Sequence, residues 1–381
     1  MVIRYGEQIV DEADIQAVCD VLRSDYITQG PVVERFEKTI AQYTRAEYCR
    51  AFNSATSALH AGYLALGVGP GDIVWTSPNT FVATANAAHM CGAELDFVDI
   101  DYKTRNLNID SLAQKLNAAA TNNRLPKVIT PVHFGGLSCE MSEIWDLSQQ
   151  YGFKVMEDAS HAIGGEYRGN KIGSCKYSDI TVFSFHPVKI ITTGEGGAAT
   201  TNDTELSSKL ASIRSHGVTR DINSLSQKNY PAHYYEMQSL GFNYRMTDIQ
   251  AALGLSQFDK LDKFIEKRNE LANLYAKFFK NYDLNILKVP ENDISTYHLY
   301  TICVENRDDI YLHLYENGIQ ANVHYIPVSY HPFWAKFGFQ KGQFPIAERY
   351  YEKALSLPLH PKLNSDDIEK IVSHILLEVV G

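Results

Sequence analysis

The chain has 381 residues, of which 45% are hydrophobic and 21% charged, the balance of an ordinary soluble globular protein. A formal net charge of −10 gives no global field that would attract nucleic acid or anionic lipid, so neither is expected as a partner. The N-terminus has no signal-peptide pattern, and no apolar run reaches the roughly 18 residues of a membrane span. The six cysteines are scattered without a C-x-x-C pair, which indicates reduced thiols and a cytoplasmic location.

The first two thirds of the chain alternate between predicted helices and predicted strands. Apolar residues have helical spacing at 11–22 and 32–43, a short strand follows at 48–52, and another helix at 57–66. Short apolar runs predict further strands, and helical segments such as 79–90 and 142–151 separate them; these runs lie at 73–75, 94–98, 127–131, 154–156 and 179–185. The alternation is typical of an α/β fold in which helices cover a mainly parallel sheet.

The pattern changes after residue 244. A long amphipathic helix is predicted over 248–279, and Thr247 with Gln250 forms a plausible capping box at its start. Strands near 298–304 and 321–325 flank a helix at 307–317, and a last helix covers 365–379. We therefore expect a large domain over residues 1–247 and a smaller α+β domain over residues 248–381.

A polar segment rich in glycine follows the predicted strand at 179–185. It places Ser184, His186 and Lys189 at the carboxyl end of that strand, where ligands bind in open α/β sheets. A lysine among apolar neighbours loses hydration, which lowers its pKa and leaves more neutral amine to attack a carbonyl. Lys189 is therefore a candidate for a Schiff base, although a lone lysine in this position is more often a solvated surface charge.

Three other segments could hold parts of one flat, phosphorylated ligand. Glu157 or Asp158, at the end of another strand, could bind a protonated pyridine nitrogen, or act only as a helix cap or surface acid. The small polar residues 53–57 run into a helix start, where amides and hydroxyls bind phosphate, although ordinary capping by Ser54 or Thr56 gives the same pattern. Phe81 could stack on a ring or belong to the core.

Several other chemistries lack their sequence signals. The glycines at 67, 69 and 71 follow a helix and precede a strand, the reverse of a dinucleotide-binding fingerprint. The chain has no H-E-x-x-H segment, so no metal site is expected, and no G-x-S-x-G elbow, which weakens a serine hydrolase reading.

Taken in order along the chain, six segments resemble the fold-type-I, pyridoxal-phosphate-dependent sugar aminotransferases of the DegT/StrS kind. These segments are residues 53–57, 80–81, 157–162, 184–189, 194–197 and 241–248. The resemblance implies a large domain with a mainly parallel mixed sheet between helices and a smaller C-terminal domain. Within this family, residues 182–197 and 214–217 are most similar to the branch that acts in pseudaminic acid biosynthesis.

The resemblance also implies roles for individual residues. Lys189 would hold the cofactor covalently and move protons, Asp158 would contact the pyridine nitrogen, and His161 would lie beside the ring hydroxyl. The resemblance implies further cofactor contacts for Ala55, Thr56, Phe81, Ser184 and Asn243. It also implies a homodimer with shared active sites, in which Asn243 reaches the cofactor of the neighbouring subunit. Residues implied in the substrate cleft are Tyr26, Gln29, Arg245, His324 and Tyr325.

The implied reaction moves an amino group from L-glutamate, by way of pyridoxamine phosphate, to the C4 ketone of a UDP-linked 4-keto-6-deoxy-N-acetylhexosamine. Some relatives carry histidine in place of the lysine and dehydrate the sugar, so Lys189 favours transamination. Three alternatives remain. A related enzyme could use another keto-sugar or regiochemistry, and a non-catalytic protein could only bind nucleotide sugars. A nicotinamide-dependent oxidoreductase would need the glycine fingerprint that the chain lacks.

Overall fold

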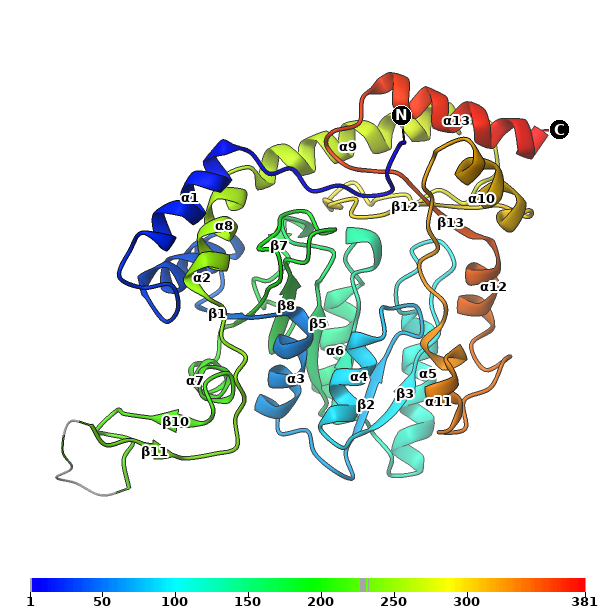
Figure 1. Cartoon of the computed structure of the whole chain (residues 1–381). Helices are drawn as coiled ribbons and strands as arrows, with labels where there is room; N and C mark the ends of the chain where they lie inside the picture. Colours follow the sequence, from blue (N-terminus) through cyan, green and yellow to red (C-terminus); the bar gives the residue numbers. More distant parts are fainter. Residues whose placement is uncertain (1, 227–230, 232, 381) are drawn as a thin grey trace.

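A seven-stranded sheet forms the centre of the N-terminal lobe in the computed structural model, which describes residues 2–226, 231 and 233–380 (Figure 1). Its strand order is β1-β9-β8-β5-β4-β2-β3. Five neighbouring strands, from β8 to β3, are parallel, whereas β9 runs antiparallel to both β8 and β1. The predicted mainly parallel α/β sheet is confirmed. The strands are β1 (Tyr48–Phe52), β2 (Ile73–Thr76), β3 (Glu94–Phe97), β4 (Val128–Thr130), β5 (Lys154–Asp158), β8 (Ile180–Ser184) and β9 (Gly197–Thr201).

Helices cover both faces of this sheet because successive strand residues point to opposite sides. Val74 and Val182 belong to a core cluster with α3 (Ala55–Ala65), α4 (Ala83–Met90) and α7 (Thr204–Ile213). Their neighbours Trp75 and Phe183 face the other way. Trp75 packs with α5 (Ile109–Thr121) and α6 (Met141–Tyr151), and Phe183 with α2 (Pro31–Thr44) and α8 (Asp248–Phe258).

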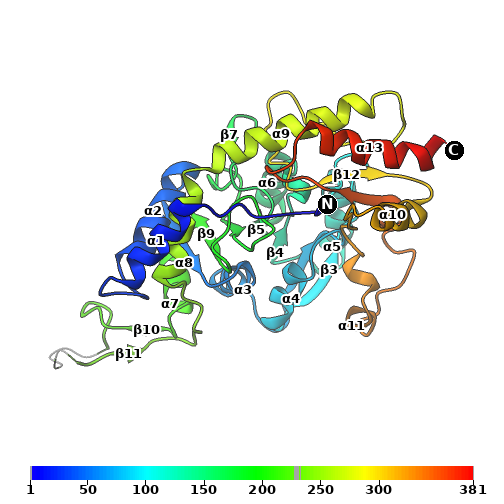
Figure 2. The same ribbon diagram turned by 45° about the horizontal axis from the view of Figure 1, so that its top comes forward.

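The C-terminal lobe is built around a two-stranded antiparallel sheet of β12 (Tyr300–Cys303) and β13 (Ala354–Leu357). Helices α9 (Leu261–Phe278), α10 (Arg307–Glu316) and α13 (Ser365–Val380) pack on it. Ile3 joins the same core, since its amide donates to Gly318 and its carbonyl accepts from Gln320. Both chain ends therefore lie at this lobe (Figure 2).

The remaining elements are α1 (Glu12–Leu22), α11 (Pro332–Ala335), α12 (Pro345–Lys353), β6 (Glu166–Tyr167), β7 (Asn170–Lys171), β10 (Val218–Thr219), β11 (Glu236–Met237), and the 3-10 turns Phe134–Gly136 and Val328–Tyr330.

The single long helix predicted over 248–279 is wrong, because the structure has two helices, α8 and α9, with a break at Asp259 and Lys260. The predicted capping box of Thr247 and Gln250 is present at the start of α8. At the break, Lys260 Nζ lies 2.8 Å from Oδ2 of the buried Asp14 in α1. This ion pair ties the break to a distant helix, and hydrophobic periodicity contains no signal for it.

The strand predicted at 321–325 is also wrong. Asn322 makes one isolated bridge to Ser356, and the strand that pairs with β12 is instead β13. Beyond Asn322 the chain uses side-chain partners in place of a strand ladder: the Tyr325 amide donates to Oδ1 of Asn79, 3.2 Å away. The alternating apolar and polar residues at 321–325 thus lead into a polar site.

The proposed boundary between residues 247 and 248 stays a prediction. Residues of α8 pack against α2 and the large sheet. The first residue from α9 in the core of the C-terminal lobe is Leu271. Within the described ranges, no helix is both long and apolar enough to cross a bilayer.

Candidate active site

A cavity of about 460 Å³ opens at the carboxyl ends of β5 and β8. Asp158 and Ser184, the last residues of these strands, both line it. The N-terminus of α3 and the segment before α4 form further walls, and residues 322–325 reach in from the C-terminal lobe. The cavity therefore takes its lining from both lobes, at the edge of the sheet that the sequence predicts.

Asp158 is held firmly in this cavity. It is 5% exposed, and its Oδ2 accepts a hydrogen bond of 2.6 Å from Thr84 Oγ1. Its Oδ1 accepts from the Ser160 amide at 3.1 Å. Thr84 is in turn 2.9 Å from the hydroxyl of Thr80, one helical turn earlier. These bonds orient the carboxylate, so it can face a cationic ring nitrogen without rotating.

Lys189, in the turn that follows β8, also lines the cavity. Burial lowers the pKa of its amine to about 8, although the negative charge of Asp158 acts in the opposite direction. An amine with this pKa is neutral often enough at physiological pH to attack a carbonyl and to accept a proton. The desolvation that the apolar sequence context predicts is therefore present.

The N-terminus of α3 provides an anion site at one end of the cavity. Ser54 caps this helix by accepting from the Ser57 amide, which leaves the amides of Ala55 and Thr56 ahead of the first intrahelical hydrogen bonds. A Cβ at Gly197 would lie 2.5 Å from the Ala55 amide nitrogen, so only glycine lets β9 approach the helix this closely. Ser184 adds a hydroxyl. Exposed amides, the helix dipole and a hydroxyl fit a phosphate group.

Phe81 is 59% exposed and forms part of the cavity wall. Its ring centroid is 6.3 Å from that of Tyr325. An aromatic face left this open on the cavity side favours ring stacking over the alternative of a core aromatic. Together with the anion site, Asp158 and Lys189, it gives a cavity whose residues fit pyridoxal phosphate.

A cluster of histidines and tyrosines closes the side of the cavity toward the C-terminal lobe. His161 Nε2 is 3.1 Å from the Tyr325 hydroxyl, and its ring centroid lies 4.4 Å from that of His298. Burial and the neighbouring charge of Lys189 hold the pKa of His161 well below its usual range. Burial lowers the pKa of His324 to about 3. Both rings are therefore neutral.

Most of the predicted site residues lie together. Those that line the cavity are Ala55, Thr56, Phe81, Asp158, His161, Ser184, Lys189, His324 and Tyr325. Asn243, Arg245, Tyr26 and Gln29 are not among its lining residues. Asn243 and Arg245 lie beside β1, where the Asn243 carbonyl accepts from Asn53 Nδ2 and Arg245 makes a bridge to Phe52. Tyr26 borders a separate hollow between α1, α2 and α8. The roles of these four residues stay predictions.

Three residues of the site were missed by sequence reasoning. Thr84 holds Asp158, the Gly135 amide donates to His161 Nδ1 at 3.2 Å, and His298 packs on the His161 ring. Of these three residues, only Thr84 had a sequence signal for a place in the site. It lies four residues after Thr80, which is next to Phe81. In the parts of the chain that the structure describes, no group of three or more His, Cys, Asp or Glu residues could hold a metal ion.

Comparison with known proteins agrees with the fold and the cavity. Residues 8–376 match the model of the DegT/DnrJ/EryC1/StrS aminotransferase family. The chain is 38% identical, over 99% of its length and 97% of the relative's, to the UDP-4-amino-4,6-dideoxy-N-acetyl-β-L-altrosamine transaminase of Campylobacter jejuni.

Two solved structures extend the comparison to three dimensions. The structure of Helicobacter pylori PseC, an aminotransferase involved in the biosynthesis of pseudoaminic acid, superimposes with a TM-score of 0.90 at 32% identity and covers 100% of both chains. The PLP-form of Spr1654 from Streptococcus pneumoniae, described as a putative sugar aminotransferase, gives a TM-score of 0.88 at 29% identity over 98% of both chains. The resemblance seen in the sequence is confirmed: this chain belongs to the DegT/DnrJ/EryC1/StrS aminotransferase family.

Proposed function

We propose that this protein is a pyridoxal-phosphate-dependent aminotransferase that acts on a nucleotide sugar. Its donor would be L-glutamate, and its acceptor the C4 ketone of UDP-2-acetamido-2,6-dideoxy-β-L-arabino-hex-4-ulose. The observation that carries the proposal is the joint presence of Lys189, Asp158 and an open helix N-terminus in one cavity. The activities named for the C. jejuni relative and for PseC support this choice of sugar.

The residues of the cavity divide the task of holding the cofactor. The amides of Ala55 and Thr56 and the hydroxyl of Ser184 would bind its phosphate, and Phe81 would stack on its ring. Asp158, already oriented by Thr84, would keep a proton on the ring nitrogen. When bound, the cofactor supplies an electron-accepting ring that stabilises negative charge on a substrate carbon.

Lys189 supplies the chemistry of the protein itself. With a pKa of about 8, its Nζ would be neutral often enough to hold the cofactor aldehyde and, when free, to take the proton from the donor α-carbon. The same nitrogen would deliver a proton to the sugar carbon that receives the amino group. One side chain would thus serve as covalent anchor and as proton carrier in both half-reactions.

The charge of the cavity supports the proposal that a second copy of the chain completes it. Among the described lining residues, Lys189 is the only lysine or arginine, and Asp158 and Glu195 bring negative charge. A cofactor phosphate and a substrate diphosphate need more positive charge or hydrogen-bond donors than this. We therefore propose a homodimer in which Asn243 and Arg245 contribute to the active site of the neighbouring subunit. We also propose a cytoplasmic location.

A direct assay tests the substrate. The purified holoenzyme is incubated with L-glutamate and a panel of UDP-linked and dTDP-linked 4-keto-sugars, and products are identified by mass spectrometry. We expect the named UDP-sugar to be aminated fastest and the Lys189→Ala variant to form no product. Faster amination of another keto-sugar would refute the sugar assignment only. Binding of nucleotide sugars without amination of any would favour the non-catalytic alternative.

A further inference from the structure

The hydrogen bonds of His161 determine which of its ring nitrogens carries the proton. Its Nδ1 accepts from the Gly135 amide at 3.2 Å, so this nitrogen has no proton of its own. A neutral ring with an accepting Nδ1 must have its proton on Nε2. That proton points to the Tyr325 oxygen, 3.1 Å away. Because Tyr325 accepts this bond, its own hydroxyl proton is free to be donated into the cavity that the residue lines.

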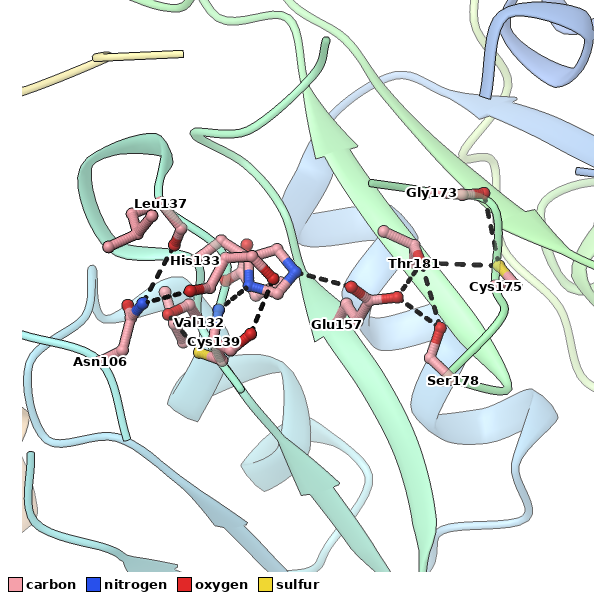
Figure 3. A network of polar contacts seen from close by, with 12 residues as sticks. Asn106, Val132, His133, Leu137, Cys139, Glu157, Gly173, Cys175, Ser178 and Thr181 are labelled. Atoms are coloured by element: carbon pink, nitrogen blue, oxygen red, sulfur yellow. Dashed lines mark hydrogen bonds and ion pairs between the residues drawn. The ribbon is translucent and has the colours of Figure 1, made fainter. Parts of the chain in front are cut away.

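The turn that presents the Gly135 amide is anchored by the side chain of His133. His133 Nε2 lies 2.6 Å from Glu157 Oε2, and its Nδ1 accepts from the Cys139 amide at 3.1 Å (Figure 3). Burial opposes charge on His133, but the Cys139 thiol and the Glu157 carboxylate raise its pKa to about 10, which favours the cation. The geometry argues the other way, because the Cys139 amide donates to Nδ1 and this bond needs an Nδ1 without a proton. We follow the geometry, in which Nε2 carries the proton and donates to Glu157.

Glu157 is a buried carboxylate that three donors satisfy. Besides His133, the hydroxyls of Ser178 and Thr181 donate to its Oε1, the latter at 2.6 Å (Figure 3). Burial opposes ionisation, but these hydrogen bonds keep the pKa of Glu157 below its usual value. The carboxylate is therefore a fixed acceptor behind the sheet, and it holds His133 in one orientation.

The two ends of this network meet in adjacent residues of β5. Glu157 and Asp158 are consecutive, so their side chains leave opposite faces of the strand. Asp158 enters the cavity while Glu157 binds His133, and the His133 amide donates to the Asp158 carbonyl at 3.1 Å. A displacement of His133 would thus reach the cavity by two routes, through the backbone of Asp158 and through Gly135.

We propose that the Glu157–His133 pair positions residues for the reaction by holding the turn Phe134–Gly136 in place. The Gly135 amide of that turn sets the tautomer of His161. This tautomer makes Tyr325 a proton donor toward an anionic oxygen of the ligand in the cavity. The identity of that ligand rests on the proposed function. The tautomer does not, since it follows from contacts within the chain. His133 and Glu157 are positioning residues, and Tyr325 is the group that touches the ligand.

The tautomer is measurable in the cofactor-free protein by NMR of the full chain labelled with ¹⁵N-histidine. The signals of His161 are assigned by their loss in His161→Asn. We expect the proton of His161 on Nε2 and none on Nδ1. A proton on Nδ1, or on both nitrogens, at neutral pH would overturn the proposal. Because no turnover is involved, failure of the sugar assay would leave this result standing.

Variants of the anchor test whether it acts on His161. His133→Phe keeps a flat aromatic side chain at this position but loses both hydrogen bonds, and we expect His161 to populate both tautomers. Thr181→Val is the matched control, because it removes another buried donor to Glu157 and leaves His133 in place. An unchanged His161 tautomer in folded His133→Phe, or an equal change in Thr181→Val, would contradict a positioning role.

A second variant covers the case in which His133→Phe does not fold. Asn106 holds the same turn separately, since its Oδ1 accepts from the Phe134 amide at 2.9 Å. Asn106→Ala should shift the His161 tautomer in the same direction. Tyr325→Phe should leave the tautomer as it is and shift the absorption maximum of bound pyridoxal phosphate. An unshifted His161 tautomer in Asn106→Ala would refute the role of the turn in setting that tautomer. An unshifted spectrum in Tyr325→Phe would refute contact between Tyr325 and the ligand.

Discussion

At the scale of single residues, the site depends on a lysine whose charge is costly and a carboxylate that reduces that cost. Burial lowers the pKa of the Lys189 amine to about 8, and the negative charge of Asp158 raises it against this effect. A neutral side chain in place of Asp158 would therefore lower the lysine pKa further. The two residues are thus coupled even before any ligand binds.

This coupling predicts how attachment of the cofactor depends on pH. The rate at which apoenzyme binds pyridoxal phosphate covalently should rise with pH, reach half of its maximum near pH 8 and level off above that pH, because only the neutral amine of Lys189 attacks the aldehyde. In Asp158→Asn the midpoint should move below 8, and turnover should fall by roughly a thousandfold, or about 4 kcal/mol in the barrier. Stopped-flow absorbance over a pH series measures the midpoint. An equal or higher midpoint in Asp158→Asn would contradict the coupling.

The sequence was most informative at this scale. Lys189, Asp158 and Phe81 each follow or precede a regular element in a recognisable local pattern, and the structure brings them into one cavity. The Gly135 amide and His298 could not be predicted in this way. Each acts through a residue more than twenty positions away in the chain, and no local pattern reports such a contact.

At the scale of elements, the anion site exists because β9 and α3 come close together. Gly197 at the start of β9 faces the backbone of Ser54 and Ala55, and a methyl group there would meet the Ala55 nitrogen at 2.5 Å. The backbone would have to shift, because the nearest atoms belong to the backbone of Ser54 and Ala55 and not to a flexible side chain. The close approach of two backbones thus sets the position of the amides that bind phosphate.

Gly197→Ala should therefore weaken binding of pyridoxal phosphate at least about tenfold and lower stability by about 1–3 kcal/mol. Equilibrium dialysis and thermal unfolding measure the two effects. Gly69→Ala is the matched control, since no atom lies within 4 Å of a Cβ built at Gly69, and it should change neither quantity. A Gly197→Ala protein with unchanged cofactor affinity would exclude this site for the phosphate.

Sequence reasoning succeeded with most elements of the N-terminal lobe and failed at two places in the C-terminal part. The central strands are buried on both faces and stand out in the sequence as short apolar runs, whereas the ion pair of Lys260 with Asp14 at the break between α8 and α9 has no local sequence signal. Residues 321–325 alternate between apolar and polar side chains as a strand would, but residues 322–325 line the cavity instead of continuing a sheet. At both places the chain makes polar contacts with distant residues that local periodicity does not report.

At the scale of the whole molecule, one cavity takes its residues from two lobes of the chain. Lys189 and Asp158 come from the large sheet, while His324 and Tyr325 come from the segment after α10. Asn243 and Arg245 remain outside. This arrangement agrees with the proposed dimer, in which residues left outside one cavity serve the other, and periodicity within one chain cannot reveal such sharing.

Subunit complementation tests the shared site. Lys189→Ala and Asn243→Ala proteins are each expected to have little activity as homodimers. After unfolding and refolding as an equal mixture, half of the dimers are mixed and have one intact site, so activity should recover to about a quarter of the wild-type level. Separately refolded samples provide the control. No recovery in a mixture shown to contain mixed dimers would place Asn243 in the site of its own chain or outside both.

The most direct test of the account is to find the atom to which the cofactor is attached. Holoenzyme is reduced with borohydride, digested and mapped by mass spectrometry. We predict loss of the yellow absorption band and a pyridoxyl group on the peptide that contains Lys189, with no label in Lys189→Ala. A label on any other lysine, or a wild-type protein that stays colourless after incubation with pyridoxal phosphate, would contradict the account.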